Sequence, residues 1–460
     1  MNIKSFIPRG IKNLWHLLEG FYANMMYGFP SHSLKIIGVT GTDGKTTTAT
    51  MIYEMLKKGG LKVGLITSVS AYIGKREIDT GFHVTTPGAS DIPRYLNLML
   101  REGIEWVVLE VTSHGLDQNR IAGIEFEKAV FTNITHEHLD YHKTWRSYAL
   151  AKTKLINMVK EGGDIIYNEG ERGGKFIAKM ISKASNVLIR NVCSKKLIKN
   201  PVSTIDGLSF SCSIKGKEEK VTIPIIGDYN MTNAQCAIKV CENLIESNII
   251  LETLREFKGI KGRMQLARRT KPCKIIIDFA HTPNALRKAL KTLLPFKEKG
   301  RLIVIFGCAG LRDYKKRPMM GKIAARFADI IIITAEDPRT EKLLTINNSI
   351  INGAYENGGV LVKRFASRKL FKTSSFKKII GNIEKAFTEN KKPVLVFDDE
   401  SIKSREDAIE CAVKLVKPDD ILLVTGKGHE KSLCFGKTEY PWSDFEAVKK
   451  AVQIKYNIPQ

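Results

Sequence analysis

The sequence predicts an α/β protein with two domains, and three observations carry this prediction. Short apolar runs alternate with stretches of helical apolar spacing over residues 34–159, which is typical of a doubly wound parallel sheet. The same alternation restarts at residue 274 and continues to residue 424. Between the two regions, residues 187–226 form short β-type runs separated by turn residues, which predicts a small antiparallel subsheet attached to the first domain.

The first domain begins with an apolar run at residues 34–37, and its other elements follow in order. We expect strands at 62–66, 106–110 and 129–134 and helices at 48–58, 91–101, 145–159 and 231–246. The glycine-rich stretch after the first strand, Glu110 and Asn133 each follow an apolar run. Functional groups of such folds gather at the carboxyl ends of parallel strands, so we expect these three features to converge.

The second domain is expected to be a Rossmann-like α/β unit. Its predicted strands are 275–278, 302–306, 330–334 and 421–424, and its predicted helices are 284–294 and 322–328. A boundary near residues 258–262 gives three segments: an N-terminal amphipathic helical segment at 1–34, a central domain at 35–258 and a C-terminal domain at 259–460. The basic stretch at 360–392 is less regular, and we interpret it as an insertion or a mobile surface.

Composition and charge exclude several classes of protein. The 460 residues are 43% hydrophobic and 26% charged, which is ordinary for a globular protein with two or three cores. The formal net charge of +25 has no nucleic-acid recognition motif beside it, so we predict no nucleic-acid partner and a lysine-rich surface suited to anionic substrates or an anionic membrane face. Eight scattered cysteines without a secretory signal predict reduced thiols and a cytoplasmic location.

Residues 11–29 are apolar and aromatic but are interrupted by Lys12, His16 and Glu19. Those interruptions argue against a spanning helix, which needs about 20 largely uncharged residues. We expect an amphipathic helix that either packs on the body of the protein or makes peripheral contact with a membrane.

The first strand leads into Gly38-Val-Thr-Gly-Thr-Asp-Gly-Lys-Thr-Thr47, which has the pattern of a phosphate-binding loop. Strand, glycine loop, Gly-Lys-Thr and helix together present backbone N–H groups and a helix N-terminus to an anion. Lys45 is expected to reach the β- and γ-phosphates and Thr46 to hold Mg²⁺. The pattern departs from the generic motif at Val39, where a glycine is usual. The predicted nucleotide contacts of this P-loop domain are Gly41, Thr42, Asp43, Gly44, Lys45, Thr46 and Thr47.

Two polar segments, 110–120 and 133–142, follow neighbouring strands. Mg²⁺ prefers oxygen ligands, so Glu110 is a sensible ligand and His138 an unusual one. A zinc site built from the histidines of the second segment is the alternative, and a phosphate-bound Mg²⁺ is favoured over it.

These segments and others in the same order, from about residue 36 to 445, resemble the Mur ligases, which add amino acids to a peptidoglycan precursor. The other matching segments are Ala151-Lys152, Gly262-Arg263-Met264, 278–283, 306–318 and Gly426-Lys427-Gly428-His429-Glu430. Within that family the set most resembles the member that adds the third residue. The resemblance implies that ATP phosphorylates a substrate carboxylate and that the amine of the incoming amino acid then attacks the acyl phosphate.

The resemblance also implies roles for individual residues. Lys45 and Thr46 would hold the ATP phosphates and Mg²⁺, Glu110 and His138 would be metal ligands, and Lys152 would be carbamylated to hold a second Mg²⁺. The implied contacts with the muramoyl-dipeptide substrate are Thr85, Thr86, Thr112, Gln118 and Arg120. The implied nucleotide contacts outside the loop are Asn233, Arg263, Asp278 and Arg317. The implied pocket for the incoming amino acid is Asp337, Arg339, Gly426 and Glu430.

The sequence departs from the family pattern in ways that leave alternatives open. Only 34 residues precede the first strand, so we expect no N-terminal uridine-recognising domain. Glu137 and Leu311 stand where the family has aspartates, and Glu336-Asp337-Pro338-Arg339 replaces Asp-Asn-Pro-Arg. Arg339 favours meso-diaminopimelate as the added amino acid. The alternatives are addition of lysine, action on a lipid-linked precursor, and a non-ligating nucleotide-binding protein that recruits partners.

Overall fold

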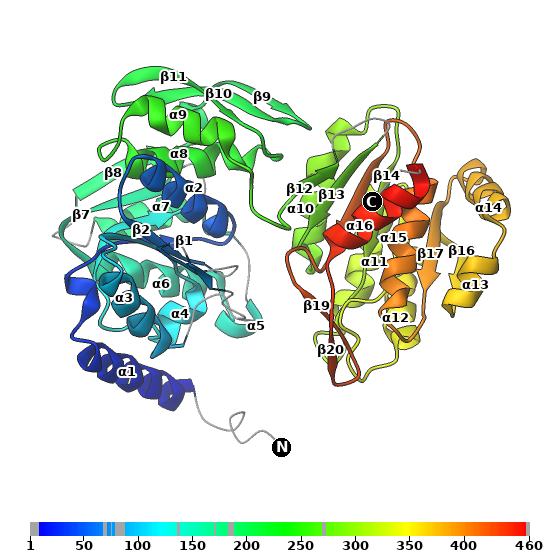
Figure 1. Cartoon of the computed structure of the whole chain (residues 1–460), viewed down its shortest axis with the longest axis horizontal. Helices are drawn as coiled ribbons and strands as arrows, with labels where there is room; N and C mark the ends of the chain where they lie inside the picture. Colours follow the sequence, from blue (N-terminus) through cyan, green and yellow to red (C-terminus); the bar gives the residue numbers. More distant parts are fainter. Residues whose placement is uncertain are drawn as a thin grey trace. The chain divides into compact units, whose positions relative to one another are not determined.

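The computed structural model describes residues 9–67, 71–74, 76–78, 88–135, 139–169, 172–182, 188–268 and 273–456. The chain divides into two compact units (Figure 1). Unit 1 comprises residues 1–203 and 207–258, and unit 2 comprises residues 204–206 and 259–460. The mixed α/β architecture expected from the sequence is confirmed, with a mainly parallel sheet in each unit.

The main sheet of unit 1 has the strand order β4-β3-β2-β5-β1-β6-β7-β8 within the described residues. The run from β2 to β8 is parallel, and β3 and β4 form an antiparallel extension at one edge. The strands are β1 (Lys35–Thr40), β2 (Val63–Ile66), β3 (Ala71–Ile73), β4 (Arg76–Ile78), β5 (Trp106–Glu110), β6 (Phe126–Phe131), β7 (Val159–Asn168) and β8 (Leu188–Cys193).

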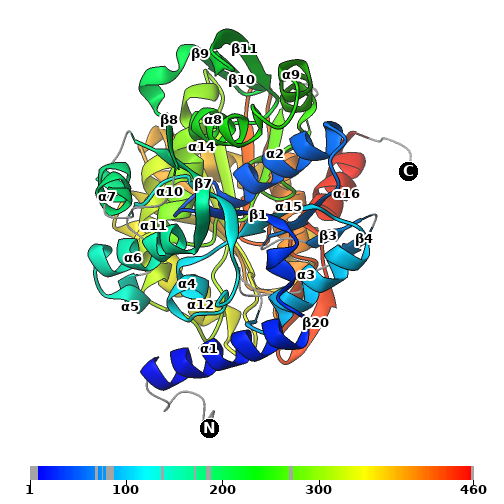
Figure 2. The ribbon, with the colours of Figure 1, turned by 90° about the vertical axis from the view of Figure 1, so that its left-hand side faces the viewer.

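Helices cover both faces of this sheet (Figures 1 and 2). On one face α3, α4, α6 and α7 pack over an apolar core, and on the other face α2 and α8 pack together. The described helices of unit 1 are α1 (Arg9–Met26), α2 (Lys45–Lys58), α3 (Asp91–Arg101), α4 (Ser113–Asp117), α5 (Leu139–His142), α6 (Trp145–Thr153), α7 (Arg172–Ile181), α8 (Tyr229–Cys241) and α9 (Ser247–Glu256). None of the described helices in the protein is long and apolar enough to cross a membrane.

The predicted small subsheet is present as β11-β10-β9, with β10 and β11 antiparallel. Its strands are β9 (Lys199–Thr204), β10 (Gly207–Ile214) and β11 (Lys217–Ile223). In β10 the buried residues alternate with less buried ones, so one face of the subsheet is covered. The seven cysteines whose side chains the structure describes are buried and free.

Unit 2 is built on a sheet of order β12-β13-β18-β14-β15-β17-β16, parallel except for β12. Its strands are β12 (Gln265–Arg268), β13 (Lys274–Asp278), β14 (Leu302–Phe306), β15 (Ile330–Ile333), β16 (Gly359–Phe365), β17 (Lys392–Phe397) and β18 (Ile421–Thr425), with a separate hairpin of β19 (Ser432–Phe435) and β20 (Thr438–Pro441). Its described helices are α10 (Pro283–Leu293), α11 (Lys316–Phe327), α12 (Leu343–Tyr355), α13 (Arg368–Thr373), α14 (Phe376–Thr388), α15 (Lys403–Leu415) and α16 (Asp444–Tyr456).

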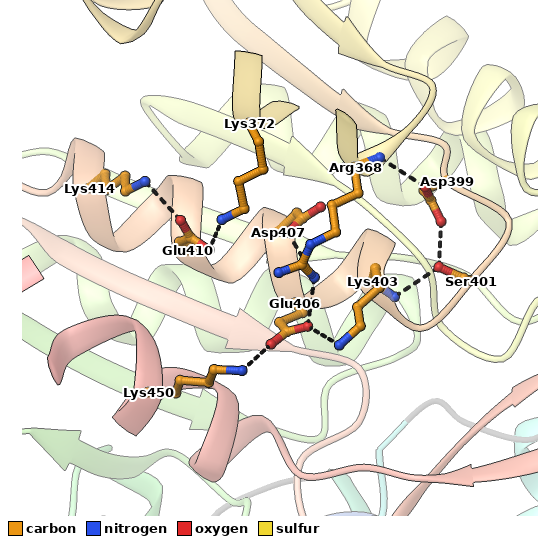
Figure 3. A network of polar contacts seen from close by, with 10 residues as sticks. All are labelled: Arg368, Lys372, Asp399, Ser401, Lys403, Glu406, Asp407, Glu410, Lys414 and Lys450. Carbon is orange, nitrogen blue, oxygen red and sulfur yellow. Dashed lines mark hydrogen bonds and ion pairs between the residues drawn. The ribbon is translucent and has the colours of Figure 1, made fainter. Parts of the chain in front are cut away.

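The interpretation of residues 360–392 as an insertion or mobile surface is wrong. The stretch supplies edge strand β16, helices α13 and α14, and the start of β17. Figure 3 shows why its many basic residues are compatible with order: Arg368 and Lys372 of α13 pair with Glu406 (2.9 Å) and Glu410 (2.5 Å) of α15. The apolar signal was weak because β16 lies at the sheet edge and most of its residues are only half-buried.

The helix predicted at 145–159 is also wrong in its second half. Helix α6 ends at Thr153, a 3₁₀ turn spans Lys154–Met158, and β7 starts at Val159. Leu155 and Ile156 are fully buried in that turn and therefore continue the apolar pattern of the helix although the helix has ended. The strand expected at 129–134 lies three residues earlier, at β6.

Candidate active site

The glycine-rich loop connects β1 to α2 at the carboxyl end of the main sheet of unit 1. Gly44 precedes α2 with a left-handed φ of 79°, and a Cβ atom placed on it would lie 2.3 Å from the Asn233 side-chain oxygen. A Cβ atom on Gly41 would lie 1.9 Å from the Thr132 hydroxyl. The loop therefore requires glycine at both positions. Val39 takes the place of the usual motif glycine without conflict, because it is a fully buried residue of β1.

The loop backbone is held in shape by the end of the neighbouring strand β6. The Asn133 side-chain oxygen accepts hydrogen bonds from the N–H groups of Thr42 (3.2 Å) and Asp43 (2.9 Å), and the Thr132 hydroxyl donates to the Asp43 carbonyl (2.6 Å). The expected convergence of the loop with Asn133 is confirmed. Neutral side chains of β6 and the residues after it therefore fix the backbone of Thr42 and Asp43.

Glu110 ends β5 and converges with the loop as expected. Its carboxylate accepts a hydrogen bond of 2.9 Å from the Thr46 hydroxyl at the start of α2. The Lys45 ammonium donates to the Thr42 carbonyl (2.9 Å), so it lies folded back over the loop. A carboxylate and a hydroxyl side by side are oxygen donors of the kind that Mg²⁺ prefers.

Lys152 lies at the end of α6 and reaches the same loop from another side. Its side chain is almost fully buried, its ammonium donates to the Gly41 carbonyl (2.7 Å), and it lies 4.7 Å from the centre of the Tyr148 ring. Tyr148 is also within 3.0 Å of the Thr42 hydroxyl. The unmodified ammonium acts as a donor here and cannot ligate a metal, so the predicted metal role depends on carbamylation.

The predicted muramoyl-peptide contacts Thr112, Gln118 and Arg120 flank α4: Thr112 directly precedes the helix, and Gln118 and Arg120 follow it. Thr112 caps α4 by accepting from the Gly115 N–H (3.0 Å), and Gln118 donates to the Tyr141 hydroxyl (3.2 Å). Burial lowers the pKa of Arg120, against the opposing influence of Tyr141 and Glu19. Thr85, Thr86 and His138 lie outside the described residues. Among the residues that are described, no three metal-binding side chains gather. His136 also lies outside them, so the zinc alternative stays a prediction.

Thr47 lies in the first turn of α2. Asn233 lies on α8 against Gly44, and its amide donates to the Asn230 side chain (2.9 Å). It is therefore adjacent to the loop, as its predicted nucleotide role requires.

In unit 2, Asp278 ends β13 and accepts from the N–H groups of Met264 (2.7 Å) and Ala280 (2.8 Å). Burial raises the pKa of Asp278, opposed by the nearby Arg263 guanidinium, which lies 4.7 Å from the centre of the Phe279 ring.

A second group of charged residues lies at the carboxyl ends of β15 and β18 in unit 2. The buried Lys427 ammonium contacts both carboxylate oxygens of Asp337 (2.9 and 2.8 Å) and one of Glu430 (2.5 Å). Burial alone would lower the pKa of Lys427, but the carboxylates of Glu430 and Asp337 outweigh it and raise the pKa. Sequence reasoning included Gly426 and Glu430 but missed Lys427, although it stands in the same Gly-Lys-Gly-His-Glu segment.

Gly426 lies beside a buried carboxylate. A Cβ atom on Gly426, whose φ is 111°, would be 2.7 Å from Glu336 Oε2. This oxygen accepts no hydrogen bond from the described residues, and burial raises the pKa of Glu336 to about 7. Glu336 is therefore a second residue that the sequence analysis did not assign to the site.

Two arginines of unit 2 differ in their partners. Arg317 is buried and forms a two-point ion pair with Glu341, at 2.6 and 2.8 Å. Arg339 has a left-handed φ of 56°, and its guanidinium donates a long hydrogen bond of 3.4 Å to the Gly310 carbonyl. A purely structural role for Arg339, as an ion pair with Glu341 or Glu336, is a further possibility from the sequence. The structure contradicts it, because Glu341 pairs with Arg317 and no carboxylate in the described part of the chain pairs with Arg339.

The P-loop at the end of a parallel sheet and the Thr46–Glu110 oxygen pair define the class of protein: a nucleotide-binding α/β enzyme. Comparison with known domain families narrows the class. The Mur ligase middle domain matches residues 39–241, and the Mur ligase, glutamate ligase domain matches residues 262–428. The chain belongs to the Mur ligase family, whose members are ATP-dependent enzymes that form amide bonds.

Curated relatives and solved structures agree with this assignment. The UDP-N-acetylmuramoyl-L-alanyl-D-glutamate–2,6-diaminopimelate ligase of Clostridium tetani is 33% identical over 94% of this chain and 81% of its own length. The enzyme of the same name from Clostridioides difficile is 34% identical over the same shares. A solved structure of a ligase with this name has a TM-score of 0.60 at 25% identity, covering 92% of this chain and 79% of its own. A MurF ligase from Thermotoga maritima in complex with ADP shares the fold, with a TM-score of 0.60 at 16% identity over 94% of this chain and 84% of its own.

Proposed function

We propose that this enzyme adds the third amino acid, meso-diaminopimelate, to a muramoyl-L-Ala-D-Glu precursor of peptidoglycan. A carboxylate oxygen of the precursor attacks the γ-phosphorus of ATP and ADP leaves, which gives an acyl phosphate. The amine of diaminopimelate attacks the acyl carbon, phosphate leaves, and the amine loses a proton. The observation that carries the proposal is the hydrogen bond between Thr46 and Glu110 beside the glycine loop. It occurs in a chain related to the 2,6-diaminopimelate ligases described above.

The residues of unit 1 have separate tasks in this reaction. The N–H groups of the loop and of the first turn of α2 bind the phosphates. Lys45 swings from the Thr42 carbonyl to the β- and γ-phosphates and offsets the charge that develops on the transferred group. Gln118 and Arg120 orient the muramoyl peptide, and Thr85 and Thr86 are proposed for the same task.

Mg²⁺ is proposed as the accompanying ion. The oxygens of Thr46 and Glu110 fit it, with His138 as a further proposed ligand. When bound, Mg²⁺ supplies positive charge next to the transferred phosphoryl group. Carbamylation of Lys152 forms an N–C bond between the neutral amine and CO₂ with loss of a proton, and converts a buried donor into an anion that can hold a second ion.

The amino-acid pocket supports diaminopimelate over lysine. Lys427 offsets one of the two negative charges of Asp337 and Glu430. The raised pKa of Glu336 keeps much of that side chain protonated near neutral pH. Arg339 is paired by no carboxylate of the described residues and can bind a substrate carboxylate in a two-point contact. Lysine has the same distal ammonium as diaminopimelate but lacks the distal carboxylate, so Arg339 would face a like charge with no anion to bind.

The test is amino-acid-stimulated phosphate release from ATP with muramoyl-L-Ala-D-Glu. We expect kcat/KM for diaminopimelate to exceed that for lysine at least tenfold, and Arg339→Ala to lower this ratio about tenfold, by the loss of one charge-assisted contact. Arg326→Ala, on the exposed side of α11, is the control and should leave the ratio unchanged. A preference for lysine, or an unchanged ratio in Arg339→Ala, contradicts the pocket. ATP turnover that no amino acid stimulates would favour the non-ligating alternative.

The carrier and the location of the reaction are proposals as well. The cytoplasm is the compartment that supplies ATP and the reducing conditions expected for the free cysteines. Peripheral membrane contact through residues 11–29 is proposed because large apolar side chains of α1 are exposed, and the ligase activity does not depend on it.

A further inference from the structure

Helix α1 carries its apolar side chains on the outside of unit 1. Figure 2 shows the helix along the lower edge of the unit, below α3 and α4. The exposed fractions of its large apolar side chains range from 40% for Leu17 to 68% for Trp15. These side chains are Ile11, Leu14, Trp15, Leu17, Leu18, Phe21, Tyr22, Met25 and Met26. Single exposed apolar residues are ordinary, but nine on one helix form a continuous patch.

The opposite side of α1 is small and polar, and this side attaches the helix to the unit. Asn13 donates to the Asp117 carbonyl (2.8 Å), and the fully buried Asn24 donates to the Ala122 carbonyl (2.9 Å). A Cβ atom on Gly20 would lie 3.5 Å from Ala89, so the helix backbone approaches the unit closely there. The packing is therefore inverted relative to an ordinary surface helix, which turns its apolar side inward.

The inversion is fixed by the position of the anchoring residues. Residues 13, 20 and 24 share one side of the helix because they are spaced by four and seven positions. Each of the three makes a specific close contact with segment 117–123 or with Ala89. Turning the apolar side inward would break these hydrogen bonds and turn Asn13 and Asn24 out to solvent. The contacts of Asn13, Gly20 and Asn24 therefore determine that the apolar patch faces outward.

The shape of the patch indicates what covers it. At 100° per residue the nine side chains spread over about 180° of the helix circumference. A second helix packed as in a coiled coil would cover only a narrow stripe of the α1 surface. A flat, deformable surface such as a bilayer can cover half of the helix circumference. Trp15 and Tyr22, on the half of the patch nearer to Lys12, have rings that favour the boundary between lipid headgroups and chains.

The charges near the patch indicate an anionic surface. Residues 1–29 contain Lys4, Arg9 and Lys12 against one acidic residue, Glu19. Glu19 is occupied on the protein side, since it accepts a hydrogen bond from the Ser90 hydroxyl (2.9 Å) and contacts His16 (3.3 Å). Lys12 is at the border of the patch, where a long side chain can reach lipid phosphates.

We infer that α1 docks unit 1 on an anionic lipid bilayer, with the patch buried among the headgroups and the helix lying in the plane of the membrane. The contact of Asn13 with residue 117 then holds the segment that carries Gln118 and Arg120 close to the bilayer surface. This inference extends the membrane contact proposed above. It can be wrong even when the proposed ligase activity is correct.

The experiment is co-sedimentation of the full chain with vesicles of phosphatidylcholine alone or of equal parts of phosphatidylcholine and phosphatidylglycerol. The variant Trp15→Ser/Leu18→Ser/Tyr22→Ser removes the middle of the patch. The control Leu344→Ser/Tyr355→Ser/Leu370→Ser removes side chains of unit 2 that are 46–50% exposed. We expect the wild type and the control to bind the anionic vesicles at least tenfold more tightly than the neutral ones, and the patch variant to lose at least tenfold in affinity. Amino-acid-stimulated turnover with a soluble precursor should be the same in all three.

Two further measurements keep the inference falsifiable if the triple variant folds poorly. Lys12→Glu leaves the patch intact and should weaken binding to anionic vesicles several-fold, with a weaker salt dependence. Trp15→Phe should bind as the wild type does but lose the blue shift of tryptophan fluorescence on vesicle binding. Negligible binding by the wild type, or equal binding by the patch variant, overturns the inference. A wild-type dimer that the patch variant dissociates would assign the patch to a second copy and overturn it too.

Discussion

The glycine loop of unit 1 and the Lys427 pocket of unit 2 both follow the carboxyl ends of parallel strands, yet they are built in different ways. The loop is shaped mainly by its glycines and by hydrogen bonds to its backbone, from the neutral side chains of Asn133 and Thr132 and from the ammonium groups of Lys45 and Lys152. The pocket is shaped by charges that neutralise one another, with Lys427 between Asp337 and Glu430. A site of the first kind responds to the size of a side chain, and a site of the second kind responds to charge and pH.

The largest expected effect tests whether the loop is a phosphate site at all. Lys45→Ala should lower turnover more than a hundredfold, because the transferred phosphoryl group loses a cation that its charge requires. Lys57→Ala, at the exposed far end of the same helix, should leave turnover unchanged. Steady-state kinetics of the two folded variants decide this, and more than a tenth of wild-type turnover in Lys45→Ala rules out the assignment.

The next effect concerns Lys152, which is proposed to act in its carbamylated form. Lys152→Ala should lose most activity and recover part of it with short-chain carboxylic acids, which replace the missing carbamate anion. Lys154→Ala, two residues on and exposed, is the control. Mass spectrometry of intact protein held under CO₂ gives an independent reading. Full activity without any added acid would mean that Lys152 only supports the Gly41 carbonyl.

Gly44→Ala tests whether the loop responds to size. The left-handed φ costs an alanine about 1–2 kcal/mol, and its Cβ would clash with Asn233, so nucleotide affinity should fall at least tenfold. Gly60→Ala is a matched control with a φ of 82° and no atom within 4 Å of its Cβ position. Titration with a fluorescent ADP analogue measures the difference. Equal affinities in the two variants would show that the close approach to Asn233 is irrelevant.

Asp337→Asn tests whether the pocket responds to charge at constant size. Lys427 would lose one of its two carboxylates, and the KM for the amino acid should change about tenfold, in keeping with ~1.5 kcal/mol for one charged hydrogen bond. The KM for ATP should stay the same. The exposed Glu384→Gln serves as control. A change in the KM for ATP alone would contradict the assignment of Asp337 to the amino-acid pocket.

The last effect acts on stability and not on activity: it is the pH dependence that Glu336 gives to unit 2. Its pKa of about 7 in the folded protein lies above the usual value of 4.5, because the side chain is buried. Between about pH 4.5 and 7 the unfolded chain releases the proton and the folded chain keeps it, so rising pH removes up to roughly 3 kcal/mol of stability, and no more is lost above pH 7. Glu336→Gln should flatten this slope in denaturant unfolding across that range. An unchanged slope would contradict the raised pKa.

The same contrast explains what the sequence could predict. Helix 91–101 and strand 106–110 were predicted with the bounds that α3 and β5 have, because apolar spacing and length are local signals. The loop and its convergence with Glu110 and Asn133 were predictable for the same reason, since glycines and strand ends are visible in the sequence. The roles assigned to individual residues there stay predictions.

Other features depend on partners that are far away in the sequence. The ion pairs of Lys427 with Asp337 and of Arg317 with Glu341 join residues separated by 90 and 24 positions, and nothing in the local pattern selects those partners. Strand β7 was missed because a buried 3₁₀ turn extended the apolar pattern of α6. Helix α13 was missed because its basic residues Arg368 and Lys372 find carboxylates on α15, which follows later in the chain. Arg364 of strand β16 likewise pairs with the later residue Asp398.

The position of β18 has a consequence for the synthesis of the protein. This strand lies between β13 and β14, although it is the last strand of its sheet to leave the ribosome. Until residues 421–425 emerge, the edges of β13 and β14 that pair with β18 have no partner. Unit 2 therefore folds only near the end of translation, while the strands of the main sheet of unit 1 have all emerged by residue 193. A nascent chain stalled before residue 421 should already protect unit 1 from protease and leave unit 2 open to it.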